Sequence, residues 1–394
     1  MTLNKVKPDA VKKKKEVKRG SNTSKRLIAL DAVRGLAVIG MFLQHFAMNE
    51  WNATIVSGNT TLLFVLCGGI SYSIMAQRML ERGTEPFLFR ARMLARAVFI
   101  DLVGYTLILL NTPYGVILPA YAALFVLALV LINHRLIVLV WTTAILLVIS
   151  PPLMIIGGSL LAHAYLLQDI AGGSMSALAL APAFLAGMVI GRLDMSKVST
   201  ASTCLGIGLI FFMFSKVMGT FFLPRWSHSF ENWLVQVLGT STTEADQYAI
   251  WPLNVEQPLW HTLLSIAPHS ASTFQTMLGL GLSLIVLGIF FLIPSKGHVL
   301  LKPFAAVGRV ALTMYSAQFV VVWICEHAGI QYSLGEMPFG DLIVAMIAII
   351  AGLLITRMPS GPLESAMRRF DQLFTTTSKT LTDKQAKNQQ QIES

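Results

Sequence analysis

The sequence predicts an all-α membrane protein: a polytopic bundle of about ten transmembrane helices with both termini in the cytoplasm. Hydrophobic residues make up 54% of the 394 residues and charged residues only 13%, whereas charged residues account for roughly 25% of a soluble domain. The mean hydropathy is +0.64. A water-soluble chain of this length could not bury so much apolar surface, so we expect the bilayer to be its solvent.

A helix needs about 20 mostly apolar residues to cross a hydrocarbon core roughly 30 Å thick. Ten segments meet this requirement, near residues 27–48, 60–77, 96–111, 115–132, 136–156, 176–192, 200–223, 271–293, 303–325 and 341–357. Small residues let transmembrane helices approach closely. We therefore expect close helix contacts at four glycines of the second and sixth segments, namely Gly68, Gly69, Gly187 and Gly191.

The distribution of Lys and Arg sets the expected orientation, because cytoplasmic loops of membrane proteins are enriched in these residues. The predicted external loops contain a single one, Arg225, and comprise residues 112–114, 157–175, 224–270 and 326–340. The sequence thus predicts a plasma-membrane protein with a cytoplasmic N-terminus. Its parts are a basic tail at 1–26, a membrane domain at 27–357 with the long external loop 224–270, and a cytoplasmic tail at 358–394 whose polar end is expected to be disordered.

The net charge of +10 could indicate nucleic-acid binding, but much of the excess lies in the N-terminal tail. A basic tail next to a first apolar segment is typical of a topology signal that also contacts anionic lipid. We therefore expect no nucleic-acid partner.

The first segment contains three ionisable residues, Asp31, Arg34 and His45. At 100° per residue, the eleven-residue separation places Arg34 and His45 about 20° apart on one helix face and roughly 16 Å apart along it. Asp31 precedes Arg34 by three positions, within reach of a helical ion pair. Ionisable groups within membrane spans are usually functional. The alternative is that Asp31 and Arg34 pair at the cytoplasmic interface and His45 merely ends the helix.

Arginines also concentrate at the start of the third segment, at Arg90, Arg92 and Arg96, and one lies in the ninth segment, Arg309. A planar guanidinium group binds phosphate bidentately, so these residues could hold the phosphates of coenzyme A. Ordinary positive-inside anchoring explains the same charges. Tyr315 and Gln318 follow Arg309 on the same predicted helix and could line a cavity.

The long external loop is rich in aromatic residues and histidine, including Trp260, His261 and His269. Such residues form the belts found at membrane interfaces, but they could also bind a sugar-like acceptor. Because no histidine pair has the i, i+4 spacing of a helical metal site, we expect no metal.

Several motifs resemble a known family. Residues 26–46, which contain LDAVRGLAVIGMFLQH, resemble the opening span of bacterial membrane proteins similar to the heparan-α-glucosaminide N-acetyltransferase catalytic domain. Arg34 and His45 also fit the Arg-x10-His pattern of broader integral membrane acyltransferase families. Later segments are similar too: LFVLCGGISYSIMAQR at 63–78, PHSASTF at 268–274, VGRVALTMYSAQ at 307–318 and GPLESAMRRF at 361–370.

This resemblance implies an acetyltransferase that takes acetyl-CoA from the cytoplasm and acylates an envelope sugar or glycolipid at the outer face. In a mycolate-producing bacterium, a trehalose mycolate would be a natural acceptor, and envelope-synthesis or export proteins would be natural partners. His45 would be the catalytic histidine, with Arg34 and Asp31 structuring its helix. In lysosomal relatives the acyl-accepting histidine lies in a loop, whereas His45 is predicted on a helix. Direct transfer, with His45 deprotonating the acceptor, is therefore the expected mechanism.

Two other functions account for the same residues. A transporter of a polar lipid or solute could use Asp31, Arg34, Asp101 and Arg309 as a proton pathway, although no inverted repeat is evident. A structural member of an envelope-synthesis complex would tolerate replacement of the polar residues within its spans.

Overall fold

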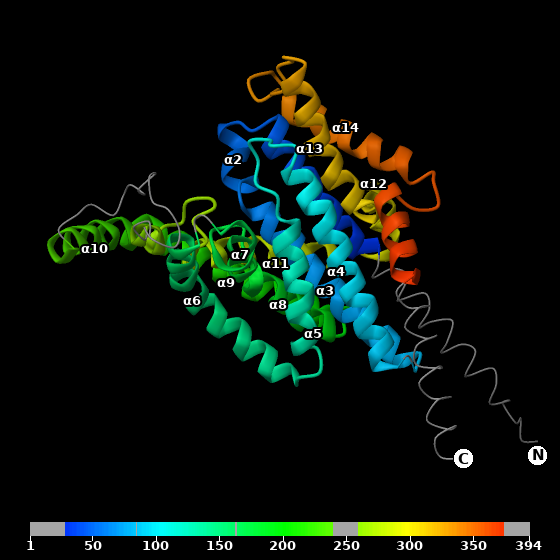
Figure 1. Cartoon of the computed structure of the whole chain (residues 1–394), viewed down its shortest axis with the longest axis horizontal. Helices are drawn as coiled ribbons and strands as arrows, with labels where there is room; N and C mark the ends of the chain where they lie inside the picture. The colour runs from blue at the N-terminus through cyan, green and yellow to red at the C-terminus, as the bar shows by residue number, and fades with distance from the viewer. Residues whose placement is uncertain (1–27, 84, 162–163, 239–258, 374–394) are drawn as a thin grey trace, which may run out of the picture.

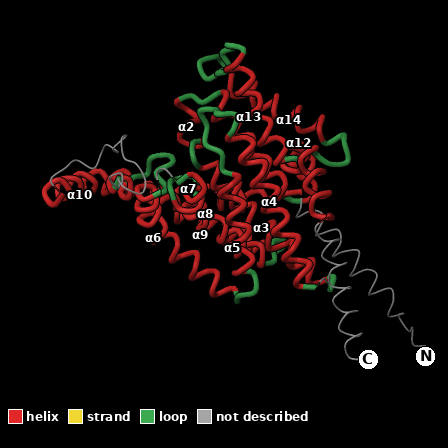
Figure 2. Tube along the Cα trace, viewed as in Figure 1, coloured by secondary structure: helices red, strands yellow, loops and turns green. Residues whose placement is uncertain are grey.

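The computed structural model describes residues 28–83, 85–161, 164–238 and 259–373, and this part of the chain is helical with no β-strand (Figures 1 and 2). The basic tail 1–26 and the end of the C-terminal tail, from 374, lie outside the described residues. The first helix is Ile28–Phe46. The longer helices after it are α3 Asn59–Glu81, α4 Pro86–Ile108, α5 Leu118–Leu131, α6 Leu136–Leu160, α8 Ala177–Arg192, α9 Val198–Val217, α10 Leu223–Leu238, α11 Thr273–Leu292, α12 His298–Arg309, α13 Ala311–His327 and α14 Gly340–Ile355. Short helices are α2 Glu50–Val56 and α7 Tyr165–Ala171, and 362–373 forms a final helix.

Each of the ten predicted apolar segments contains a helix. Among the described residues, five helices are long and apolar enough to cross a membrane, and the bent pair α12–α13 would make a sixth. Three more apolar helices, α5, α8 and α14, have only 14, 16 and 16 residues. The fold is therefore an all-helical membrane bundle, while the count of ten spans stays a prediction.

The ninth predicted segment, 303–325, is not one helix. α12 and α13 meet at a bend of 66° next to Val310, whose φ of −116° and ψ of 34° are not helical. At this bend Gly308 packs directly on the first helix, where an added Cβ atom would collide with the carbonyl oxygen of Asp31. The new N-terminus of α13 is capped by Glu364 of the final helix, which accepts hydrogen bonds from the backbone N–H groups of Leu312 and Thr313 at 2.9 and 3.1 Å. Capping of this kind satisfies the donors that a helix start leaves unpaired.

The core is built around α3, most of which is buried. Of the four glycines expected at close contacts, Gly69, Gly187 and Gly191 lie between α3 and α8, whereas Gly68 lies against the Tyr121 side chain of α5. A Cβ atom at Gly69 would collide with the carbonyl oxygen of Phe184, and one at Gly187 would collide with that of Leu66. These contacts fix α3 and α8 at close range and leave no room for sliding.

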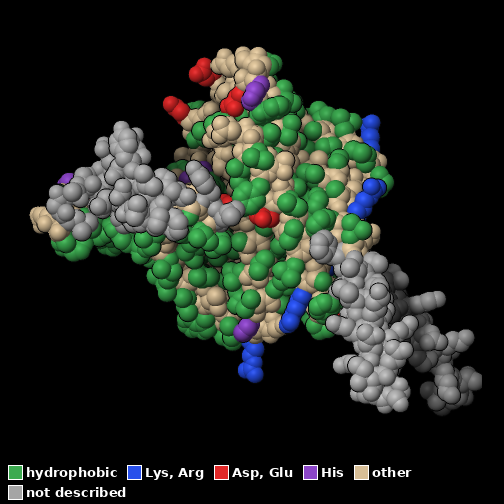
Figure 3. All heavy atoms as spheres, in the orientation of Figure 1, with side chains coloured by type: hydrophobic (Ala, Val, Ile, Leu, Met, Phe, Trp, Pro, Cys, Tyr) green, Lys and Arg blue, Asp and Glu red, His purple; other side chains and the backbone are tan. Residues whose placement is uncertain are grey.

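The outer helices are apolar and exposed. In the spanning windows of α6 and of the α9–α10 helix, only 17% and 11% of residues are buried inside the protein. Side chains such as Trp141, Ile145, Ile210 and Phe221 are more than half exposed. Figure 3 shows that hydrophobic side chains cover most of this face, with Lys and Arg along the lower and right-hand edges and most acidic groups towards the top.

The predicted external loop 224–270 begins as a helix. α9 continues through the π-helical turn Met218–Phe222 into α10, so that Val198–Val237 forms one helix of 40 residues. At 1.5 Å per residue this helix is about 60 Å long, and α10 extends away from the bundle (Figure 1). Residues 239–258 of the loop lie outside the described part of the chain, and Trp260–Leu264 forms a 3₁₀ turn.

Candidate active site

A cavity of about 230 Å³ lies at the end of the first helix that carries His45. It is enclosed by side chains from the first helix, α3, α13 and three connecting segments, and its lining includes Gln44, His45, Tyr114, His269, Tyr315 and Gln318. His45 and His269, two of the site residues predicted from the sequence, therefore line the same cavity.

His45 is fixed in the wall of this cavity by Tyr114. The two rings are stacked, with centroids 3.9 Å apart and an interplanar angle of 18°. The Tyr114 hydroxyl donates a hydrogen bond of 3.0 Å to the His45 carbonyl oxygen, which lies in the last turn of the first helix and has no partner within that helix. His45 Nδ1 is buried and has no hydrogen-bond partner among the described residues.

α13 supplies the opposite wall through Tyr315 and Gln318, and both line the cavity as the sequence suggested. The Tyr315 hydroxyl accepts a hydrogen bond of 3.0 Å from the backbone N–H of Ile117, which ties α13 to the segment before α5. Gln318 is fully buried, and neither its Nε2 nor its Oε1 has a hydrogen-bond partner among the described residues. A buried, unpaired amide costs about 1–3 kcal/mol, so its presence calls for an explanation.

The loop that carries His269 is held in place by a proline in α6. Pro151 has no N–H group, so the carbonyl oxygen of Leu147, four residues earlier, loses its helical partner. Thr273 at the start of α11 donates a hydrogen bond of 3.0 Å to that oxygen. The Ser272 hydroxyl caps α11 by accepting from the Gln275 N–H at 3.0 Å. The start of α11 is thereby attached to α6.

His269 itself adopts a left-handed backbone conformation, with φ at 61°. Non-glycine residues rarely do so, and such outliers cluster at functional sites. Its Nε2 lies 3.2 Å from Nε2 of Gln44, within hydrogen-bond distance. Burial lowers the pKa of His269, so the ring is neutral near pH 7.

The other end of the first helix carries the predicted ion pair. Arg34 Nη1 lies 3.3 Å from Oδ1 of Asp31, and both side chains are about one-fifth exposed. Arg34 also donates to the Gly308 carbonyl oxygen at 3.4 Å and to the Ser71 hydroxyl of α3. Arg309 is close enough to Asp31 to interact with it electrostatically. Arg34 and Arg309, distant in sequence, therefore share one acidic partner.

The three arginines of α4 have separate environments. Arg96 Nε donates a hydrogen bond of 2.6 Å to Asp371 of the final helix, and its Nη1 lies 2.7 Å from the sulfur of Met75. Arg92 also acts electrostatically on Asp371, whereas Arg90 is exposed. Burial raises the pKa of Asp371, and the two arginines offset part of that rise.

α3 contacts both the ion pair of the first helix and one arginine of α4. Arg34 contacts Ser71, and Arg96 contacts Met75 one helical turn away. Arg96, one of the four arginines predicted to hold coenzyme A, therefore lies one turn of α3 away from Arg34. Arg96 is already engaged by a carboxylate.

Trp260 and His261 do not line the His45 cavity. Trp260 packs against an apolar cluster that contains Met154, Ile155 and Ala271. His261 is half-buried, with Nδ1 unpaired among the described residues. Of the three loop residues predicted to bind acceptor, the structure brings only His269 to His45.

Asp101, a residue of the alternative proton pathway, lies close enough to Asp169 of α7 to interact with it electrostatically. The Tyr105 hydroxyl donates a hydrogen bond of 2.7 Å to Asp169 Oδ2, and burial raises the pKa of Asp169. Asp101, Tyr105 and Asp169 line a separate cavity of about 310 Å³. Among the described residues, no group of three or more His, Cys, Asp or Glu side chains could hold a metal ion.

Sequence reasoning missed Gln44 and Tyr114. Gln44 precedes His45, and a polar residue beside a histidine within a span was the available signal. Nothing in the local sequence around Tyr114 indicates that its ring stacks on His45, because the two residues are 69 positions apart.

Comparison with known proteins gives a partial match. No curated protein matches the chain. Residues 224–373 match a family of membrane-associated proteins described as "Protein of unknown function (DUF418)". The matching region runs from α10 to the final helix, and it contains His269, Arg309 and Gln318 but neither Arg34 nor His45.

Proposed function

We propose that the protein is a membrane acyltransferase that transfers an acetyl group from acetyl-CoA to a hydroxyl group of an envelope sugar or glycolipid. The observation that supports this proposal is that His45 and Gln318 line one cavity, and that His45 Nδ1 and the Gln318 amide are buried without hydrogen-bond partners among the described residues. A site with a base and a hydrogen-bond donor, neither of them bonded to another described residue, suits acyl transfer.

The arrangement along the first helix supports the choice of donor. The Asp31–Arg34 pair lies roughly 16 Å from His45 by the helical rise. Arg309 and Arg96 lie near the same end. These arginines would bind the phosphates of coenzyme A while its extended arm reaches towards the cavity.

The chemistry assigned to His45 is general base catalysis. His45 takes the proton of the acceptor hydroxyl as the hydroxyl oxygen bonds to the thioester carbonyl carbon. Gln318 Nε2 donates a hydrogen bond to the oxygen that gains negative charge. The carbon–sulfur bond then breaks, and the leaving thiolate takes the proton from His45. The products are an acetyl ester and free coenzyme A, and the ring returns to its neutral form.

The proposed setting is the plasma membrane, with the arginine end in the cytoplasm and the His45 end at the outer face. A trehalose mycolate is a candidate acceptor, and proteins of envelope synthesis or export are candidate partners. Single cysteines at Arg82 and Glu336, in a background without the native cysteines, test this orientation. Glu336→Cys should react with an impermeant reagent in intact cells and Arg82→Cys should not; the reverse pattern would overturn the orientation.

The central experiment incubates purified protein with radiolabelled acetyl-CoA and an envelope-lipid extract. Wild type should label a lipid fraction, and His45→Ala should not. The control is His327→Ala, because His327 is an exposed histidine at the end of α13. Absence of label with wild type across several acyl-CoAs would refute the enzyme. Normal transfer by His45→Ala would keep the enzyme but remove His45 from its site.

The second candidate is a transporter without chemistry. The cavity that holds Asp101 and Asp169 favours it, because paired carboxylates inside a membrane protein are typical of proton-coupled pathways. If the protein is a transporter, wild type should carry substrate into proteoliposomes and Asp169→Asn should abolish this flux. Neither protein should transfer acetyl groups.

A further inference from the structure

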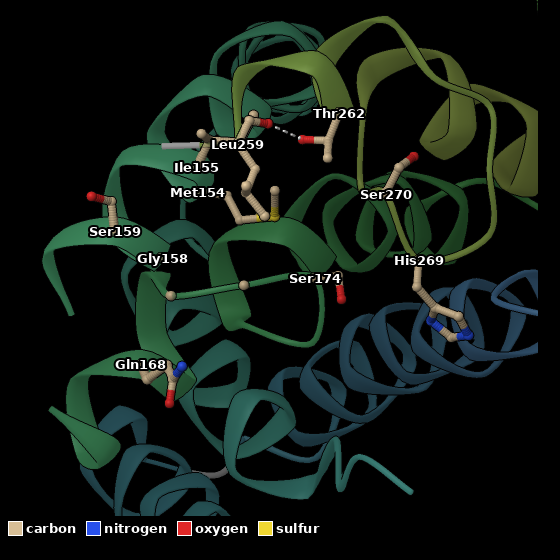
Figure 4. A pocket seen from close by; sticks show the side chains of 12 residues that line it. Met154, Ile155, Gly158, Ser159, Gln168, Ser174, Leu259, Thr262, His269 and Ser270 are labelled. Atoms are coloured by element: carbon tan, nitrogen blue, oxygen red, sulfur yellow. Dashed lines mark hydrogen bonds between the residues drawn. The ribbon is translucent and has the colours of Figure 1, made fainter. Parts of the chain in front are cut away.

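A second cavity, of about 250 Å³, adjoins the His45 cavity. It is bounded by α6, α7, the turn at 172–174 and the 3₁₀ turn Trp260–Leu264 (Figure 4). His269 lines both cavities and is therefore their common wall. The volume is just below the roughly 300–1,000 Å³ of small-molecule pockets, which suits one head group rather than a whole lipid.

The lining of this second cavity mixes apolar and uncharged polar side chains and carries no Lys, Arg, Asp or Glu among the described residues. Ser159, Gln168, Ser174, Thr262 and Ser270 line it beside Met154 and Ile155, and the Thr262 hydroxyl donates a hydrogen bond of 2.8 Å to the Leu259 carbonyl oxygen (Figure 4). Ser270 Oγ is buried without a hydrogen-bond partner among the described residues. Among the lining residues that the structure describes, His269 is the only titratable group, and burial lowers its pKa.

These groups define the chemistry of the ligand. A phosphate or carboxylate would need an arginine, a lysine or a cluster of backbone donors to replace its hydration. Hydroxyl and amide groups both donate and accept hydrogen bonds, so they match a ligand rich in hydroxyl groups. The aliphatic patches can pack against the C–H faces of such a ligand.

Two glycines keep the cavity open. A Cβ atom at Gly158 of α6 would have its nearest neighbour, the backbone nitrogen of Gly173, at 3.9 Å, and a Cβ atom at Gly173 would meet nothing within 4 Å. Glycine in a helix interior costs roughly 0.5–1 kcal/mol relative to alanine. Gly158 therefore sits where a side chain would fit the fold but would enter the cavity.

We propose that this second cavity binds the neutral, hydroxyl-rich head group of the acceptor and presents one of its hydroxyl groups past His269 to His45. The inference deepens the proposed acyltransferase function and rests on it for the role of the bound group. The binding itself is independent of any transfer step.

The test compares two matched glycines in purified protein in nanodiscs. Gly158→Leu fills the cavity, and Gly206→Leu is the control, because a Cβ atom at Gly206 in the interior of α9 also meets nothing within 4 Å. The probes are trehalose, sucrose and maltose, with glucose 6-phosphate as the charged comparator. Saturation-transfer NMR measures binding, and thermal unfolding measures stability.

We expect wild type and Gly206→Leu to bind at least one neutral disaccharide. Gly158→Leu should bind it at least tenfold more weakly while unfolding at or above the wild-type temperature. Equal binding by Gly158→Leu, a preference for glucose 6-phosphate, or no binding of any neutral disaccharide would overturn the inference. If Gly158→Leu unfolds below the wild-type temperature, Gly158→Ala is tested in its place. We then expect Gly158→Ala to show a higher KM for the acceptor or weaker sugar binding, and the absence of both would overturn the inference.

The outcomes separate the two proposals. Sugar binding that depends on Gly158 without acetyl transfer by wild type would refute the acyltransferase and retain the binding site. Acetyl transfer with a KM for acceptor that is unchanged in Gly158→Leu would retain the enzyme and refute this cavity as its acceptor site.

Discussion

His45 and Tyr114 are stacked at a centroid distance of 3.9 Å, and the Tyr114 hydroxyl also bonds to the His45 backbone. One residue therefore fixes both the ring and the main chain of the proposed base. Groups that act in catalysis depend on this kind of positioning.

Changes at Tyr114 should separate ring stacking from hydrogen bonding. Tyr114→Phe keeps the stacked ring and loses a bond of about 0.5–1.5 kcal/mol, so kcat should fall less than about tenfold. Tyr114→Leu removes the stacking partner and should lower kcat by a factor of ten or more, with KM for acetyl-CoA unchanged. Steady-state kinetics checks both values; equal kcat in the two variants would show that stacking does not position His45.

Replacement of His45 should remove the general base. A positioned base contributes about 10²–10⁴-fold to rate, so His45→Gln should lose transfer by at least 100-fold. The unfolding temperature should fall only by the loss of ring stacking on Tyr114, because Nδ1 has no hydrogen-bond partner among the described residues to lose. His327→Gln is the matched control, and a comparable loss in that variant would point to a general effect on the protein.

Gln318→Leu should have opposite effects on activity and stability. Removing a buried amide that has no hydrogen-bond partner in the described part of the chain should leave the free energy of unfolding unchanged or raised. Loss of an oxyanion donor should lower kcat by about 10²–10³-fold. Thermal unfolding and acetyl-transfer rates are measured on the same preparation. Marked destabilisation by Gln318→Leu would assign this amide to the fold instead.

Arg34→Gln should destabilise the protein, because Arg34 joins Asp31 to Ser71 and to the Gly308 carbonyl. Hydrogen bonds to charged groups contribute about 1.5–3 kcal/mol, and a loss of this order is expected in the free energy of unfolding. Arg357→Gln is the control, since Arg357 is exposed just beyond α14. No difference between the variants in unfolding temperature would contradict the structural role of Arg34.

Stability should fall on acidification in a way that depends on His269. Burial lowers the pKa of this ring in the folded protein, so the unfolded chain binds the proton first as pH falls below the usual value of about 6.5. The stability present above that pH is therefore lost as the pH decreases through it. The unfolding temperature of His269→Gln should fall less than that of wild type between pH 7 and pH 5. Parallel curves would show that His269 does not contribute.

Hydropathy located a helix in each of the ten segments, because burial in lipid demands long apolar runs. It did not locate the bend at Val310, since a contact between Gly308 and the Asp31 backbone leaves no trace in hydropathy. The common face of Arg34 and His45 followed from helical geometry. The cavity beside His45 did not, because its other walls come from distant segments.

Two further outcomes show where local sequence carries too little information. The partner of Arg96 is Asp371, 275 residues away in a predicted tail. Trp260 and His269 both looked like acceptor-binding groups, yet one packs in an apolar cluster and the other lines the cavity. Both residues are of types that can bind a sugar, so residue type alone does not predict which of them lines the cavity. Their positions depend on the path of the loop in the fold.

The contact between Gly35 and Gly308 restricts how the protein can move. A Cβ atom at Gly35 would collide with the Phe304 carbonyl oxygen, and one at Gly308 with that of Asp31, so the two backbones touch with no side chains between them. Alternating access requires one group of helices to rock against another around a central site. The first helix and α12 are joined at this seam, so any such rocking would have to carry them together as one rigid unit.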